Sequence, residues 1–213
     1  MRHSFKKRFL IICLSLITIL GITMIITPLI GYSHQEKQIQ ETLKQKPLSV
    51  SSSDTSANKS KKSAIPFPGS PKDVLGKVKI PSVNIELPIL NGATDENLKV
   101  GATTLRKNQV MGKSNYSLAG HHMKREDLLF GRLDEVKKKQ NVYLTDDHSI
   151  YVYVVDSKST VQDTDIEILD DHGRNEITLF TCDVPTSTDK RTVIHGYFEK
   201  QFSYSDEKWK ELK

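Results

Sequence analysis

The sequence predicts a mainly β domain, a sandwich or a barrel, behind an N-terminal apolar helix. Residues 9–32 form one long uncharged apolar run. From about Val74 onward, short runs rich in β-branched residues alternate with turn residues, which is the pattern of all-β domains. The second part holds about 125 residues, which is enough to bury one hydrophobic core.

The apolar run from Phe9 to Tyr32 is long enough to cross a membrane as a helix, which takes about 20 residues. The alternative is a cleaved signal peptide, whose apolar core has about 7–15 residues, and no small-x-small cleavage site follows the run. Basic residues favour the cytoplasmic side of a membrane. Four of them precede the run: Arg2, Lys6, Lys7 and Arg8. We therefore expect a cytoplasmic segment at 1–8 and a retained anchor at 9–32.

The residues after the anchor are polar and poor in large apolar side chains. Gln35–Lys46 has the composition of a short helix, and Ser49–Lys62 is a low-complexity stretch typical of a tether. We expect a flexible extracellular linker at 33–73, a folded domain at 74–200 and a C-terminal tail at 201–213.

Seven strands and a few helical stretches are expected within the domain. The strands are Gly76–Ile80, Ile85–Leu90, Asn115–His122, Asn141–Thr145, Ser149–Val161, Glu176–Cys182 and Arg191–Phe198. Helices are expected at Thr94–Val100 and at Arg125–Lys138, where Leu128, Leu129, Leu133 and Val136 form an apolar stripe. A turn is expected near Asp163–Leu169.

Charge and cysteine content exclude several classes of function. The formal net charge is +5 and the isoelectric point is about 9.0, but much of the excess positive charge is concentrated in short segments, such as the one before the apolar run. No basic face with aromatic or groove-reading elements stands out, so we expect no nucleic-acid partner. Of the two cysteines, Cys13 lies in the apolar run, which leaves Cys182 alone in the domain. A single cysteine provides neither a disulfide framework nor a zinc site built on several thiolates.

Alternation along the strands places Cys182 and His121 on faces that point out of the core. On Glu176–Cys182, Ile177 and Leu179 share one face and Cys182 lies on the other. On the strand before, Leu118 points in the opposite direction to His121. The two reactive side chains meet if their strands are neighbours.

A cysteine, a histidine and an arginine on adjoining strands would make an acyl-transfer site. A histidine takes the thiol proton and later protonates the leaving amine. A cation stabilises the oxyanion that develops during acyl transfer. Arg191 opens the strand after Cys182, across a loop short enough for a hairpin.

Each of these residues also has an ordinary structural role. A lone cysteine at a strand end is more often a small buried hydrophobe than a nucleophile. The pair His121–His122 is usual at a surface or in a core, and a solvated charge is usual for Arg191. We expect His122 to point away from its neighbour, so no metal site is expected from this pair.

Several segments resemble the sortase family. TLFTC (Thr178–Cys182), with an arginine opening the following strand, resembles the signature TLxTC. SLAGHHM (Ser117–Met123) resembles the segment that carries the family's histidine. Tyr143–Asp146 and Ile80–Leu90 are also similar. The resemblance covers residues 74–198, and the most similar subtype is the class A (housekeeping) sortase of Gram-positive bacteria.

The resemblance implies a closed eight-stranded β-barrel and a cysteine transpeptidase. Such an enzyme cleaves secreted proteins that carry a C-terminal LPxTG sorting signal between Thr and Gly, through a thioester. It then transfers the protein to an amine of lipid II, a peptidoglycan precursor. The resemblance makes Cys182 the nucleophile, His121 the general acid and base, and Arg191 the residue that binds substrate and oxyanion, with Lys190 as the alternative to Arg191.

The resemblance also implies a substrate groove and bears on calcium. The groove positions match Ala119, Thr181, Phe180, Ile166, Ile168 and Leu169. Some class A sortases bind calcium through acidic residues in the loop before the histidine strand. Here Thr103–Ser114 has no acidic residue and three basic ones, so no calcium or other cofactor is expected.

Two other functions fit parts of the same pattern. A cell-wall cysteine peptidase would use the same cysteine and histidine but hydrolyse its substrate. A membrane-tethered adhesin or binding module would leave Cys182 without a chemical role.

Overall fold

The computed structural model describes residues 2–47 and 73–213, and of residues 2–14 it describes the backbone alone. The chain divides into two compact units, Met1–Gln38 and Ile39–Lys213. Most of the predicted linker, residues 48–72, lies outside the described residues.

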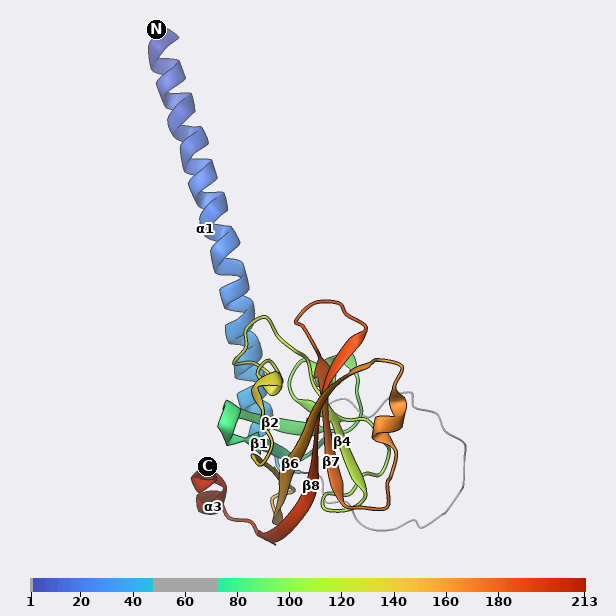
Figure 1. The fold of residues 1–213 in the computed structure, drawn as a ribbon. Helices are drawn as coiled ribbons and strands as arrows, with labels where there is room; N and C mark the ends of the chain where they lie inside the picture. Colours follow the sequence, from blue (N-terminus) through green and yellow to red (C-terminus); the bar gives the residue numbers. More distant parts are fainter. Residues whose placement is uncertain (1, 48–72) are drawn as a thin grey trace. The chain divides into compact units, whose positions relative to one another are not determined.

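The first unit consists of most of a long helix, α1, which runs from Arg2 to Leu43 and so ends five residues inside the second unit (Figure 1, blue). Within the described part of the chain it is the one helix long and apolar enough to cross a membrane, over Ser15–Leu43. Ten large apolar side chains along it are exposed: Leu16, Ile17, Ile19, Leu20, Ile22, Met24, Ile25, Ile26, Leu29 and Ile30. Apolar surface on successive positions is stable in a hydrocarbon environment and not in water.

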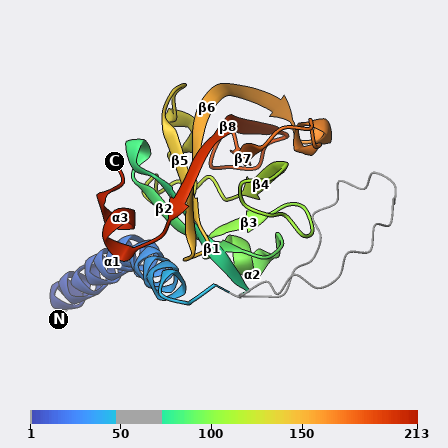
Figure 2. The same ribbon diagram turned by 90° about the horizontal axis from the view of Figure 1, so that it is seen from below.

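The second unit is built on a closed barrel with the strand order β1-β2-β3-β4-β7-β8-β6-β5 (Figures 1 and 2). This confirms the eight-stranded barrel that the resemblance implied. Neighbouring strands are antiparallel except for the pairs β2–β3 and β4–β7, which are parallel. The strands are β1 (Val74–Ile80), β2 (Ile85–Leu90), β3 (Ala102–Thr104), β4 (Asn115–Ala119), β5 (Asn141–Thr145), β6 (Ser149–Gln162), β7 (Glu176–Cys182) and β8 (Lys190–Ser203).

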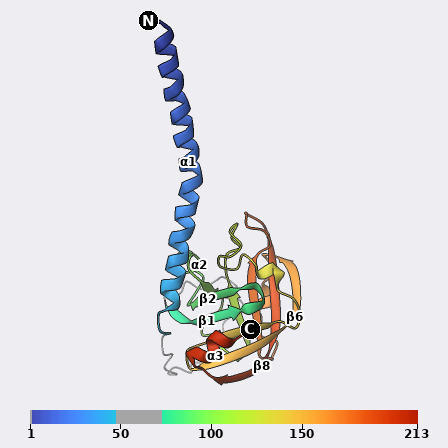
Figure 3. The same ribbon diagram turned by 90° about the vertical axis from the view of Figure 1, so that its left-hand side faces the viewer.

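Helical segments in this unit are few and short, as expected. The α-helices are α2 (Asp95–Leu98) and α3 (Asp206–Glu211), and the 3-10 helices are η1 (Pro81–Val83), η2 (Leu133–Glu135) and η3 (Ile166–Leu169). The last helix, α3, lies beside β1 and β2 (Figure 3). Its Trp209 is buried, and the indole Nε1–H donates to Glu86 Oε1 at 2.8 Å.

The barrel interior is filled by the apolar faces that strand alternation predicted. Ile177 and Leu179 of β7 and Leu118 of β4 are fully buried. Each side chain of this size contributes about 1.5–3 kcal/mol when it leaves water. The other faces of β4 and β7 are therefore free to build a site on the outside of the barrel.

The predicted helix over Arg125–Lys138 is wrong, because only Leu133–Glu135 is helical there. Leu129 has a φ of 51°, which a right-handed helix does not allow. A side chain at Gly131 would lie 2.7 Å from the backbone oxygen of Glu126, so the chain is tightly folded at this point. The apolar residues of the stripe are buried one by one along an irregular loop, and tertiary packing overrides their helical spacing.

Candidate active site

The parallel ladder between β4 and β7 brings the histidine segment and the cysteine segment together. Its register pairs Asn115 with Glu176 and continues to Ala119 with Phe180. Two positions further along the same register, residue 121 falls opposite residue 182. Side chains paired in register on neighbouring strands point to the same face of a sheet.

Three hydrogen bonds extend this ladder beyond the last strand residue, Ala119. The Gly120 amide donates to the Phe180 carbonyl at 3.1 Å, and the Thr181 hydroxyl donates to the Gly120 carbonyl at 2.8 Å. The third bond, 2.8 Å long, joins His122 Nδ1 to the Cys182 carbonyl. The predicted strand Asn115–His122 therefore ends early, at Ala119, but one backbone bond and two side-chain bonds keep the segment beside β7 as far as Cys182.

The antiparallel ladder between β7 and β8 brings an arginine to the same place. Arg191 is the Cα partner of Cys182, and partners in a ladder point to one face with Cβ atoms about 4.5–5.5 Å apart. The Arg191 guanidinium donates to the carbonyls of Thr188 and Lys190 at 2.7 and 2.9 Å, and lies 3.5 Å from Asp163. Lys190 is exposed and points to the other face, so the register favours Arg191.

The thiol and the imidazole have surroundings that suit proton transfer. Cys182 is a free cysteine and is half-buried at the end of β7. His121 lies at the surface, yet neighbouring atoms remove part of its water shell, and this desolvation lowers its pKa. The carboxylate of Asp95 acts in the opposite direction and raises that pKa. The net result is a histidine that is neutral, and so able to accept a proton, at neutral pH.

His122 has a contact that strand alternation did not predict. A backbone carbonyl only accepts hydrogen bonds, so His122 Nδ1 carries the proton in its 2.8 Å bond to the Cys182 carbonyl. The bond ties the backbone of the cysteine to the segment that carries His121. The sequence pattern contains no signal for this contact, because it forms after β4 has ended.

The predicted groove residues lie on two elements. Phe180 and Ala119 are half-buried partners in the β4–β7 ladder, and Phe180 shares a face with Cys182. Thr181 is 2% exposed and bonds to Gly120, so its side chain lies on the buried face of β7. The other three residues lie on the four-residue 3-10 helix η3: Ile166 is exposed, and Ile168 and Leu169 are half-buried.

The helix η3 lies over the same face of the sheet as the thiol. Thr178, which shares the face of Phe180 and Cys182, donates through its hydroxyl to Asn115 Oδ1 at 2.8 Å. The Nδ2 atom of the same Asn115 donates to the carbonyl of Ile168 in η3 at 3.0 Å. An apolar turn, a thiol, an imidazole and a guanidinium are thus arranged on one side of the barrel.

Comparisons with known proteins identify the family of this fold and site. A family model described as the Sortase domain matches residues 78–199, which is more than half of the chain. The chain belongs to the sortase family. Sortase A of Listeria monocytogenes is 46% identical over 127 residues, which cover 60% of this chain and 57% of that protein. Sortase A of Bacillus anthracis is 45% identical over 125 residues, which cover 59% of this chain and 60% of that protein.

A solved sortase structure agrees with these sequence comparisons. The structure of Listeria monocytogenes sortase A matches with a TM-score of 0.62 and 45% identity, and the match covers 63% of this chain and 92% of that one. The sortase resemblance of the motifs is therefore confirmed at the level of family and fold. This sortase spans 57% and 60% of the length of the two curated relatives named above.

Proposed function

We propose that this sortase is a class A cysteine transpeptidase that cleaves LPxTG-type sorting signals and transfers the cleaved protein to an amine. The observation that supports the proposal is the β4–β7–β8 register: Arg191 pairs with Cys182 across β7 and β8, and the β4–β7 register, continued two residues past Ala119, would set His121 opposite the same cysteine. Three side chains with complementary roles in acyl transfer thereby share one face of the barrel.

The first half of the reaction forms a thioester on Cys182. The sulfur attacks the carbonyl carbon of the Thr–Gly bond, and its proton passes to His121. The negative charge that develops on the carbonyl oxygen is stabilised by the Arg191 guanidinium. When the C–N bond breaks, His121 returns the proton to the leaving glycine amine, and the acyl group stays on sulfur.

The second half of the reaction releases the thioester. An amine attacks the thioester carbon, His121 accepts one of its protons, and an amide bond forms as the C–S bond breaks. The proton on His121 then restores the Cys182 thiol. Water in place of the amine would give hydrolysis, which is the reaction of the alternative cell-wall peptidase.

Mass spectrometry of the purified chain with an LPxTG peptide tests the proposal directly. We expect an acyl adduct on Cys182 and, with an amine acceptor present, an amide product joined to that acceptor. Release of the free acid alone, with the acceptor in excess, would favour the peptidase. No adduct and no cleavage would favour the binding module.

The proposed partners follow from the same chemistry. Secreted proteins with C-terminal LPxTG signals would supply the acyl group, and the amine of lipid II, a peptidoglycan precursor, would accept it. The apolar helix α1 would anchor the enzyme in the cell membrane. The basic residues before it support a cytoplasmic N-terminus and a catalytic domain on the wall-facing side.

Removal of calcium is expected to leave the activity unchanged. The loop between β3 and β4 has no acidic residue, and one of its cations, Arg106, donates to the carbonyl of Leu169 at 2.8 Å. A hard cation needs several oxygen ligands, which this loop does not offer from its side chains. Peptide cleavage measured with a chelator, and again after calcium is restored, should give the same rate. A large loss that calcium reverses would contradict this prediction.

Replacing Arg191 with alanine is expected to lower kcat/KM by roughly 10²–10³-fold, which is typical for loss of one oxyanion donor. Replacement by lysine should recover part of that loss, because the charge returns without the planar fork. Steady-state cleavage of an LPxTG peptide measures both effects. Arg132→Ala is a matched control, because Arg132 pairs with Glu135 at an exposed site. An equal loss in Lys190→Ala would contradict the assignment of oxyanion binding to Arg191 rather than to Lys190.

A further inference from the structure

The helix η3 has no buried side chain to hold it in place, although it carries three apolar residues of the proposed groove. Ile166 is 40% exposed, and the side chain of the N-cap residue, Asp165, makes no capping hydrogen bond. A short turn of this kind cannot rely on hydrophobic burial for its position. Because Ile168 and Leu169 are only half-buried, polar contacts must supply much of what holds the helix in place.

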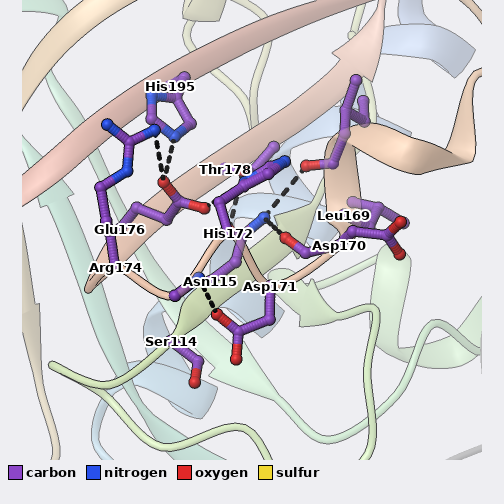
Figure 4. A network of polar contacts seen from close by, with 12 residues as sticks. Ser114, Asn115, Leu169, Asp170, Asp171, His172, Arg174, Glu176, Thr178 and His195 are labelled. Carbon is purple, nitrogen blue, oxygen red and sulfur yellow. Dashed lines mark hydrogen bonds and ion pairs between the residues drawn. The ribbon is translucent and has the colours of Figure 1, made fainter.

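Two side chains supply those contacts by binding three consecutive carbonyls. Asn115 Nδ2 donates to the carbonyls of Ile168 and Asp170 at 3.0 and 3.2 Å, and Arg106 Nη1 donates to the carbonyl of Leu169 at 2.8 Å. Figure 4 shows Asn115 directed at this segment from the neighbouring strand. We call Arg106 and Asn115 together the carbonyl brace.

The brace connects η3 to the strands that carry the reactive residues. Asn115 is 2% exposed, and all its polar atoms are used, because its Oδ1 accepts the Thr178 hydroxyl at 2.8 Å. These contacts fix the orientation of the amide, with nitrogen toward the turn and oxygen toward β7. Asn115 begins β4 and Thr178 lies on β7, so the turn is fixed to the β4–β7 ladder, whose two strands lead to His121 and Cys182.

A second polar cluster fixes the chain after the turn. Glu176, which is 1% exposed, accepts hydrogen bonds from His172 and, at 3.0 Å, from His195 (Figure 4). His172 belongs to the segment between η3 and β7, and His195 belongs to β8. The segment is thus held at both of its halves, by the brace at η3 and by this buried carboxylate just before the sheet.

We propose that Arg106 and Asn115 are positioning residues that hold η3 in the conformation that receives the apolar residues of the sorting signal. The proposal rests on the proposed function. A wall that is rigid before the peptide arrives saves the entropy of ordering it on binding. Loss of the brace should therefore weaken peptide binding, while the thiol, which lies four residues beyond Thr178 at the end of β7, keeps its reactivity.

Two variants of the full chain test the brace. Asn115→Asp keeps the shape and the bond to Thr178 but turns a donor into an acceptor that faces two carbonyls. Arg106→Met removes one donor at a half-exposed site, so it tests the brace even if Asn115→Asp does not fold. We expect KM for an LPxTG peptide to rise roughly three- to tenfold in each variant, with little change in kcat. This factor corresponds to the net free energy of about one hydrogen bond.

Lys107→Met is the matched control, because it removes the same charge from an exposed neighbour in the same loop. Its KM should equal that of the parent chain. The rate at which iodoacetamide alkylates Cys182 should also be equal in all four proteins. Unchanged KM in both brace variants, or a fall in kcat and alkylation at constant KM, would overturn the proposal.

Hydrogen exchange separates failure of the brace from failure of the proposed function. Amides in residues 163–175 should exchange faster in Asn115→Asp and Arg106→Met than in Lys107→Met. If the parent chain does not cleave the peptide, the proposed function fails, and the exchange rates still decide whether the brace holds the turn. Equal exchange in all the proteins would overturn the brace itself.

Discussion

Replacing Cys182 with alanine is expected to abolish both peptide cleavage and the acyl adduct while the barrel keeps its fold. The nucleophile forms the covalent bond on which every later step depends, so the loss of kcat/KM should exceed about 10³-fold. The thiol is half-buried at the end of β7, so its removal costs little packing. Steady-state cleavage, adduct mass and a thermal melt measure the three effects.

Val184→Ala is the matched control for this variant. Val184 is 42% exposed in the loop that follows the cysteine, and it offers no nucleophile. The Val184→Ala variant should cleave the peptide at the rate of the parent chain. Measurable turnover in Cys182→Ala, with an unchanged melting temperature, would contradict the assignment of the nucleophile.

Replacing His121 with alanine is expected to reduce kcat/KM by roughly 10²–10⁴-fold, the range for loss of a general acid and base. His121 lies at the surface, so the fold should be retained. His122→Ala should be milder, because His122 acts on the backbone of Cys182 through one hydrogen bond and takes no part in the transfer of the thiol proton. Equal losses in the two variants would contradict this division of roles.

The titration of His121 gives an independent test of its environment. Partial desolvation lowers its pKa from the usual 6.5, so its imidazole should stay neutral as the pH falls through 6.5 and become charged only below that value. The midpoint from NMR chemical shifts, measured in Cys182→Ala so that the thiol does not contribute, should lie below 6.5. A midpoint above 6.5 would show that the charge of Asp95 outweighs desolvation.

The sequence predicts most of this fold because the barrel strands have strong local patterns. Six of the seven expected strands begin or end where the structure has them, since alternation and turn residues are local signals. β3 was missed because three residues, Ala102–Thr104, are too few for a pattern to appear. The stripe at Arg125–Lys138 misled because apolar spacing alone does not distinguish a helix from a loop packed on a barrel.

In the candidate site, too, the features set by local pattern could be predicted, and the contacts between distant segments could not. The placement of Cys182 on the outer face of β7 follows from alternation, which needs one strand only. The contact of His122 with the Cys182 carbonyl and the bonds from Arg106 and Asn115 to η3 join segments far apart in the chain. Such contacts depend on the strand order β4–β7–β8, which the spacing of residues within each strand does not encode.

The parallel pairing of β4 with β7 also determines when the site can exist. The bond between His122 and Cys182 joins residues 60 positions apart, and native contacts of such high contact order form late, because a long loop must close first. A chain emerging from the ribosome presents its histidines long before its thiol, and β8 must still follow. A chain that ends before β8 therefore lacks the assembled site, and the cysteine, histidine and arginine come together only after the last barrel strand has been synthesised.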